Sequence, residues 1–280
     1  MLKHTLLAVL AHPDDESFGM GGTLALYAER GADVYLVCAT RGEVGEVAPE
    51  MLKGFNSIAE LRESELRCAA DILGLKGVFF LDYRDSGMPG SPDNQHPQAL
   101  AAQPLEEVAA NVVCYIRELR PQVVLTFDPI GGYRHPDHIA IQRATVLAFE
   151  QAANPAFGPG SRPPFTPQRL YFHTFPKGLL KLGMKILPLL GKDPHKFGSN
   201  GDIDMAAIAE VDFPTNARIN IHSVLQKKEQ AGACHASQGG GRMGGGGVSF
   251  IMRLFSGTEN FMRAYPPVGP GEKVAKDLFA

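Results

Sequence analysis

The sequence predicts an α/β protein built on a mostly parallel sheet with helices on both faces. Two observations predict this class. Short apolar runs typical of buried strands alternate with stretches of helical pattern through the first 152 residues. The helices are also long enough to form the right-handed crossovers that join parallel strands. We therefore expect a Rossmann-like sheet, followed by a less regular C-terminal part.

The first half is expected to alternate strand and helix four times. The predicted strands are Thr5–Leu10, Val34–Ala39, Val78–Leu81 and Val123–Phe127. The predicted helices are Gly22–Arg30, Ser57–Leu73, Leu105–Leu119 and His138–Gln151. Gly31 and Gly74 are expected to end the first two helices, and Asn56 to cap the second.

The second half gives weaker patterns. We expect a Pro- and Gly-rich loop at Pro155–Pro167, a strand at Arg169–His173 and a lid or partner-facing helix at Leu179–Leu190. A helix at Ile221–Ala233, a mobile glycine run at Gly239–Gly247 and an edge element or helix at Phe250–Ala264 should follow. The sequence contains no internal repeat. It therefore predicts one domain over residues 1–280, with a catalytic core at 1–152 and a C-terminal part at 153–280 that completes the pocket.

Composition excludes several classes of protein. The 280 residues are 44% hydrophobic and 20% charged with a net charge of -3, which is ordinary for a globular protein and argues against a nucleic-acid partner. The apolar start leads directly into His12 without a small-residue cleavage site, and Leu179–Leu190 is too short to span a bilayer. We expect a cytoplasmic protein without stable membrane insertion. A homo-oligomer is left open.

The four cysteines lie far apart and form no C-x-x-C pair. They are Cys38, Cys68, Cys114 and Cys234. We expect buried, reduced thiols, which would fit a reducing compartment.

Polar residues follow two of the predicted strands. The first strand runs into His12-Pro13-Asp14-Asp15-Glu16, whose crowded negative charge favours a divalent cation. His12 and Asp15 are three residues apart, so both can reach one ion. The fourth strand is followed by His135-Pro136-Asp137-His138, the best source of a third ligand. Ligands of such sheets bind beyond the carboxyl ends of the strands, where the two motifs are expected to meet.

Two other interpretations compete with a metal site. Asp14, Asp15 and Asp137 are typical helix-capping residues. Gly19-Met20-Gly21-Gly22 follows a strand in the manner of a dinucleotide site, but its spacing is wrong for G-x-G-x-x-G and the acidic neighbours would repel a pyrophosphate. We expect these glycines to let the backbone turn close to the metal loop.

The two motifs resemble those of the LmbE/PIG-L family of zinc-dependent N-deacetylases. The resemblance covers about Leu6 to Leu147 and rests chiefly on A-H-P-D-D-E and H-P-D-H. Asp82-Tyr83-Arg84-Asp85-Ser86-Gly87-Met88 and Gly131-Gly132-Tyr133 are similar to the branch that acts on mycothiol precursors and conjugates. His235-Ala236-Ser237-Gln238 also fits the pattern.

The resemblance implies a role for each matching residue. His12, Asp15 and His138 would bind zinc, and Asp14 would be the general base. His135 would be the acid or would stabilise the oxyanion, Asp137 would orient a histidine, and Tyr133 would polarise the carbonyl. Arg62, Asp85 and Glu43 would contact the sugar. From the residues alone, Arg62 and Glu65 equally suit a helix-surface ion pair, and His235 suits a structural role as well as a site role.

Three functions follow as hypotheses. The first is a zinc-dependent hydrolase that removes an N-acetyl group from a small amino sugar such as an N-acetylglucosamine derivative. The second is a zinc amidase that cleaves a larger sugar–thiol conjugate. The third is a non-catalytic, metal-containing sugar-binding module. Imidazole and carboxylate ligands suit iron as well as zinc.

Overall fold

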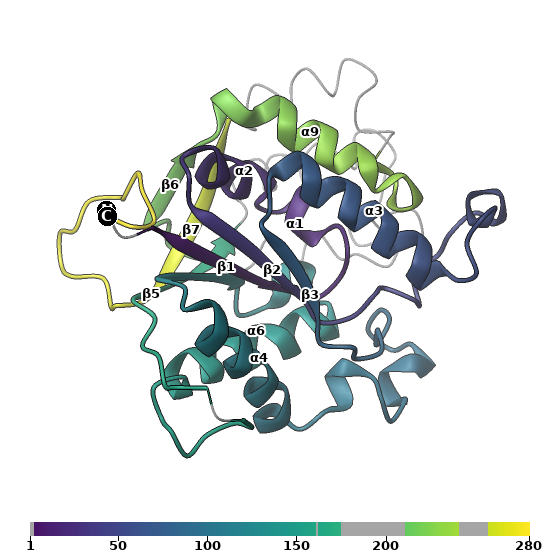
Figure 1. The fold of residues 1–280 in the computed structure, drawn as a ribbon, viewed down its shortest axis with the longest axis horizontal. Helices are drawn as coiled ribbons and strands as arrows, with labels where there is room; N and C mark the ends of the chain where they lie inside the picture. The colour runs from purple at the N-terminus through teal and green to yellow at the C-terminus, as the bar shows by residue number, and fades with distance from the viewer. Residues whose placement is uncertain (1–2, 161, 175–210, 241–256) are drawn as a thin grey trace.

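A computed structural model describes residues 3–160, 162–174, 211–240 and 257–280 (Figure 1). Its strands are β1 (Thr5–Leu10), β2 (Asp33–Cys38), β3 (Gly77–Phe80), β4 (Val123–Phe127), β5 (Arg169–Thr174), β6 (Ala217–Asn220) and β7 (Thr258–Tyr265). Its α-helices are α1 (Asp15–Phe18), α2 (Gly21–Glu29), α3 (Ile58–Leu73), α4 (Leu105–Leu119), α5 (Gly131–Arg134), α6 (Pro136–Gln151) and α9 (Leu225–Cys234).

The described strands form one sheet in the order β3-β2-β1-β4-β5-β7-β6. The first five of these are mutually parallel, and β7 is antiparallel to both β5 and β6. Helices α2, α3 and α9 cover one face, and α4 and α6 cover the other (Figure 1). The predicted α/β class, with a mostly parallel sheet between two helical layers, is confirmed.

The centre of the sheet forms the core because its strands are apolar on both faces. Leu6, Leu7 and Leu10 of β1 have no exposed surface, and all five residues of β4 are buried. Each buried leucine contributes about 1.5–3 kcal/mol relative to an exposed one. This rigid centre fixes the two loops that leave β1 and β4.

The signals that end the helices agree with the structure, but two predicted helix starts differ: α6 begins at Pro136 rather than His138, and α3 has a different cap. Gly74 ends α3 in the left-handed conformation, as expected. The N-cap of α3 is Ser57, whose hydroxyl accepts the Glu60 N–H at 3.1 Å, so the expected cap at Asn56 is wrong. Asn56 instead donates its own backbone N–H to the Glu60 carboxylate at 2.7 Å. The residue that accepts the first helix N–H is thus Ser57 and not Asn56.

The C-terminal part extends the same sheet. The strand expected near Arg169 is β5, and the expected helix near Ile221 is a short 3-10 turn at His222–Val224 followed by α9. The expectation of an edge element or helix at Phe250–Ala264 is wrong in its described portion, because β7 pairs on both sides. The predicted lid at Leu179–Leu190 and most of the glycine run lie outside the described residues.

The expectation that all four cysteines are reduced is wrong. Cys68 of α3 and Cys234 of α9 form a disulfide, with their Cα atoms 6.0 Å apart. The two helices lie side by side in the fold, although the cysteines are 166 residues apart in sequence. Cys38 and Cys114 are free thiols. The argument from reduced thiols to a reducing compartment therefore fails.

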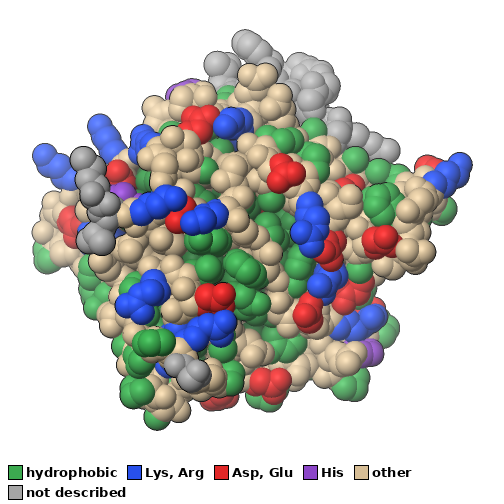
Figure 2. Space-filling model, in the orientation of Figure 1, with side chains coloured by type: hydrophobic (Ala, Val, Ile, Leu, Met, Phe, Trp, Pro, Cys, Tyr) green, Lys and Arg blue, Asp and Glu red, His purple; other side chains and the backbone are tan. Residues whose placement is uncertain are grey.

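The surface carries mixed charge. On the face shown in Figure 2, basic and acidic side chains are interspersed, and the described atoms there form no extended patch of one sign. No helix in the described ranges has both the length and the hydrophobicity that crossing a bilayer requires.

Candidate metal and catalytic site

Both sequence motifs lie at the topological switch point of the sheet. Strand β1 has β2 on one side and β4 on the other, so the chain leaves β1 and β4 towards different neighbours. The loop after β1 carries His12, and the segment after β4 carries His135 and His138. Neighbouring parallel strands end at the same edge, which is why residues 126 positions apart in sequence meet here.

Three of the predicted ligands converge. His138 Nε2 lies 3.3 Å from His12 Nδ1 and 3.3 Å from Asp15 Oδ1, and His12 Nδ1 lies 3.7 Å from Asp15 Oδ2. A tetrahedral zinc ion with bonds of about 2.0–2.2 Å separates its ligand atoms by roughly 3.3–3.5 Å. The donor types of these three residues suit zinc, and their contacts lie at or near this separation, with the two histidines facing different oxygens of Asp15.

The other ring nitrogen of His12 is held by Asp137. His12 Nε2 lies 3.1 Å from Asp137 Oδ2, which also accepts the Ser86 N–H at 2.9 Å. The Ser86 hydroxyl donates to the second oxygen of Asp137. A carboxylate in this position fixes the tautomer of a ligating histidine and leaves Nδ1 to face an ion.

Two further groups of potential ligands share His12. One consists of His12, His135 and His138, and the other of His12, Asp85 and Asp137. In the second group, Asp137 already accepts hydrogen bonds at both oxygens. In the group with His135 and His138, Nδ1 of His135 accepts the N–H of Asp137 at 3.2 Å, so only Nε2 could bind an ion. In the set of His12, Asp15 and His138, Asp15 Oδ2 accepts the backbone N–H of His12 at 2.8 Å, and Oδ1 stays available beside His138.

Asp14 lies beside the converging ligands in an unusual backbone conformation. Its φ of 122° is rare for a residue with a side chain. Its carboxylate accepts a hydrogen bond from Arg62 Nη2 at 3.0 Å. Burial raises the pKa of Asp14 and the Arg62 charge lowers it, with a net pKa of about 6. Such a carboxylate is well suited to proton transfer near neutral pH.

The neighbouring Asp15 is biased in the opposite direction. Its burial would raise the pKa, but the charge of His138 and their hydrogen bond outweigh that effect, so the pKa lies well below the usual range. In this structure Asp15 is thus held ionised, the form in which a carboxylate can bind a metal, while Asp14 can exchange a proton. Two adjacent carboxylates are therefore suited to different tasks.

His135 and Tyr133 line the opposite side of the site. The His135 ring lies 4.6 Å from that of His12 between centroids, and the Tyr133 ring lies 5.0 Å from that of His138. Burial and the neighbouring His12 and His138 charges lower the pKa of His135 to about 2. A neutral imidazole whose Nδ1 accepts a hydrogen bond carries its proton on Nε2.

The three residues expected to bind the sugar have different surroundings. Asp85 Oδ1 lies 3.5 Å from His12 Nε2, and the Asp85 N–H donates to Glu43 Oε1 at 3.1 Å. Arg62 is buried, and its two terminal nitrogens donate to Gly42 O, Pro13 O and the Asp14 carboxylate. The structure therefore places Arg62 against Asp14, and its contact with the sugar stays a prediction.

Sequence reasoning missed the partners of several supporting residues. Ser86, which binds Asp137, lay inside a stretch noted for its resemblance, but nothing in its spacing pointed to Asp137. The interpretation of Arg62 and Glu65 as an ion pair is wrong, because Glu65 instead accepts hydrogen bonds from Ser237. His235 Nε2 lies 2.7 Å from Glu16 Oε1, a contact between residues 219 positions apart.

Comparison with solved structures shows that the fold is a known one. N,N'-diacetylchitobiose deacetylase from Pyrococcus horikoshii matches with a TM-score of 0.62 and 20% identity over 95% of this chain and 87% of that chain. The 4-carboxy-2-hydroxymuconate hydratase GalB from Pseudomonas putida also matches with a TM-score of 0.62 and 20% identity, over 96% and 99%. Because their activities differ, these likenesses show the fold alone.

Sequence comparison is more specific. A protein of Geodermatophilus obscurus named 1D-myo-inositol 2-acetamido-2-deoxy-alpha-D-glucopyranoside deacetylase is 38% identical over 242 residues, which are 83% of this chain and 82% of the relative. The family model PIG-L, described as GlcNAc-PI de-N-acetylase, matches residues 7–149 and so includes both motifs. The chain therefore belongs to the PIG-L family, as its motifs predicted.

Proposed function

We propose that this chain removes the N-acetyl group from a small derivative of N-acetylglucosamine, using zinc held by His12, Asp15 and His138. The observation that carries the proposal is the convergence of these three side chains, at 3.3–3.7 Å, beside a carboxylate with a pKa of about 6. The name of the Geodermatophilus relative supports an inositol-linked 2-acetamido sugar as the substrate.

Each residue has a distinct task in the proposed reaction. When bound, the metal activates water and polarises the amide carbonyl. Asp14 takes a proton from the attacking water and returns one to the amine as the C–N bond breaks, so that acetate and a free amino sugar result. His135 donates its Nε2–H to the carbonyl oxygen as negative charge develops there, and Tyr133 closes the same side. His135 Nδ1 already accepts the Asp137 N–H at 3.2 Å, which leaves Nε2–H free for this role.

A polar cavity next to Glu43 suits the rest of the sugar. It has a volume of about 350 Å³ and is lined in part by Glu43, Asp82, Arg84, Gln98 and Gln103. Glu43 Oε2 is buried and has no hydrogen-bond partner among the described residues. The Glu43–Asp85 contact links the cavity to His12.

The test is hydrolysis by protein stripped with a chelator and reloaded with zinc or ferrous iron. We expect equal amounts of acetate and free amine from 1D-myo-inositol 2-acetamido-2-deoxy-α-D-glucopyranoside, at a higher kcat/KM than from N-acetylglucosamine. Asp14→Asn should retain the metal and lose about 10²–10⁴-fold in kcat. Zinc-loaded protein that releases no acetate from either sugar would refute the proposal.

No described feature favours the amidase over the deacetylase. The Leu179–Leu190 segment and residues 241–247, which would shape a larger pocket, lie outside the described residues. Including a bulky sugar–thiol conjugate in the same assay separates the two activities. Membership of a family of de-N-acetylases argues against a non-catalytic sugar-binding module.

A further inference from the structure

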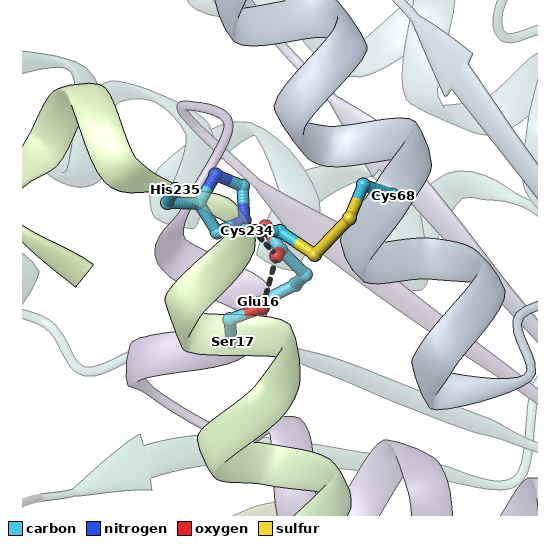
Figure 3. Close-up of a disulfide and its surroundings, with 5 residues drawn as sticks. All are labelled: Glu16, Ser17, Cys68, Cys234 and His235. Carbon is cyan, nitrogen blue, oxygen red and sulfur yellow. Dashed lines mark hydrogen bonds and ion pairs between the residues drawn. A yellow bond between two sulfur atoms is a disulfide. The ribbon is translucent and has the colours of Figure 1, made fainter. Parts of the chain in front are cut away.

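Glu16 and His235 form a buried pair (Figure 3), and Glu16 also binds the backbone of Asp14. Neither side chain has exposed surface, and His235 Nε2 lies 2.7 Å from Glu16 Oε1. The Ser17 hydroxyl donates to the same oxygen. The second oxygen, Oε2, accepts the backbone N–H of Asp14 at 3.0 Å. Glu16 thus joins His235 to the backbone of the proposed base without occupying the ligand positions.

Asp14 needs such support because its backbone is strained. Holding a residue with a side chain at a φ of 122° costs on the order of 1–3 kcal/mol. Side chains hold it on one side, since Glu16 accepts its N–H and Arg62 binds both its carboxylate and the preceding carbonyl of Pro13. On the other side, the Asp14 carbonyl accepts the backbone N–H groups of Ser17 and Phe18 at 3.0 Å. Without the Glu16 contact, the Asp14 N–H would lose its acceptor, and the backbone on the N-terminal side of Asp14 would be held less firmly in this conformation.

Glu16 in turn depends on His235. A fully buried carboxylate close to Asp14 and Asp15 is unfavourable unless a donor or cation satisfies it. His235 supplies that donor from the distant C-terminal part of the chain. The pair is therefore more than a packing contact, since it stabilises the carboxylate that binds the backbone of Asp14.

The segment carrying His235 is fixed to α3 on both sides. Cys234 precedes it and is bonded to Cys68 of α3. Ser237 follows it and donates its N–H and hydroxyl to the Glu65 carboxylate at 2.8 and 2.6 Å. Along α3, Glu65 lies about one turn after Arg62, and Cys68 about one turn after Glu65. Arg62 binds Asp14. One helix thus supports Asp14 directly through Arg62 and indirectly through His235.

We propose that Glu16 and His235 are positioning residues for the hydrolysis: His235 fixes the Glu16 carboxylate, and Glu16 holds Asp14 in the strained conformation that aims its carboxylate at the reacting water. This inference rests on the proposed function, in which Asp14 is the base. It assigns the C-terminal H-A-S-Q segment a task in the reaction, although that segment makes no described contact with the three proposed ligands.

The test is a double-mutant cycle with Asp14. His235→Phe keeps a ring but removes the donor, and we expect it to lower kcat by about tenfold or more while KM and bound zinc stay unchanged. His235→Gln, which can still donate to Glu16, should recover most of the rate. In the Asp14→Asn background, His235→Phe should change the residual rate by less than about twofold, because its effect passes through Asp14.

Glu16→Gln provides a second variant of unchanged size, should His235→Phe fold poorly. It should show the same loss of kcat and the same lack of effect in the Asp14→Asn background. The inference is overturned if either variant keeps the parent kcat, or if it lowers the rate equally with and without Asp14. Failure of the proposed function would look different, because the parent would then release no acetate, or Asp14→Asn alone would retain full activity.

Discussion

Arg62 connects the electrostatics of the site to its geometry at the level of a single residue. Its guanidinium holds the loop through Pro13 O and Gly42 O and places a positive charge 3.0 Å from the Asp14 carboxylate. That charge opposes the effect of burial, which by itself raises the pKa of Asp14. A base in this environment is ionised at neutral pH and loses its function as the pH falls through its pKa.

Replacing Arg62 by methionine should therefore move the acid limb of the pH–rate profile. Without the guanidinium, the pKa of Asp14 rises above about 6, so kcat/KM begins to fall at a higher pH than in the parent. Arg62→Lys keeps the charge and is the matched control, with a limb closer to that of the parent. An unchanged limb in Arg62→Met would mean that Asp14 is not the titrating base.

His173 gives a second prediction at this scale, for stability. It is buried on β5, and burial lowers its pKa to about 4. The unfolded chain, with a histidine pKa near 6.5, binds an extra proton between about pH 6.5 and pH 4. The contribution of neutral His173 to the free energy of unfolding is fully present above pH 6.5. About 3 kcal/mol of that free energy is lost on acidification to pH 4.

Denaturant unfolding of the parent and of His173→Gln at several pH values tests this. The variant should show a smaller loss of unfolding free energy between pH 6.5 and pH 4, by about 3 kcal/mol. Parallel pH profiles for the two proteins would show that His173 does not contribute this dependence.

Helix α3 links the halves of the molecule at the level of an element. Three of its residues, spaced three apart, contact distant parts of the chain. Arg62 contacts the loop after β1, Glu65 contacts Ser237, and Cys68 is bonded to Cys234. The sequence predicted the helix and its end at Gly74 because these depend on local spacing. It predicted neither the disulfide nor the Glu65 contact, because both partners come from α9 and the turn after it, more than 160 residues away.

The start of α3 offers a local test of the cap. Ser57→Ala removes the acceptor for the Glu60 N–H and should lower the unfolding free energy by about 1 kcal/mol. Asn56→Ala is the matched control, since it keeps the backbone N–H bond to Glu60 and loses only an exposed side-chain contact. A larger loss in Asn56→Ala than in Ser57→Ala would return the cap to Asn56.

At the scale of the whole molecule, the order of the strands in the sheet determines where the site lies. Apolar runs and crossover length sufficed to predict the parallel sheet, and the positions of the two motifs after β1 and β4 predicted where they meet. The antiparallel addition of β7 between β5 and β6 was not predictable, because strand order among distant segments leaves no local pattern. For the same reason, the motifs pointed to His12, Asp15 and His138 but not to the Ser86 support of Asp137.

Bound zinc, measured beside the rate of acetate release in His138→Ala and His135→Ala, tests the central claim most directly. The two histidines are both buried and three residues apart, so they form a matched pair. The account predicts that His138→Ala loses zinc and activity together, whereas His135→Ala retains zinc and loses at least about tenfold in kcat. Full zinc content in His138→Ala, or loss of zinc in His135→Ala, would contradict the assignment of His12, Asp15 and His138 as the metal site.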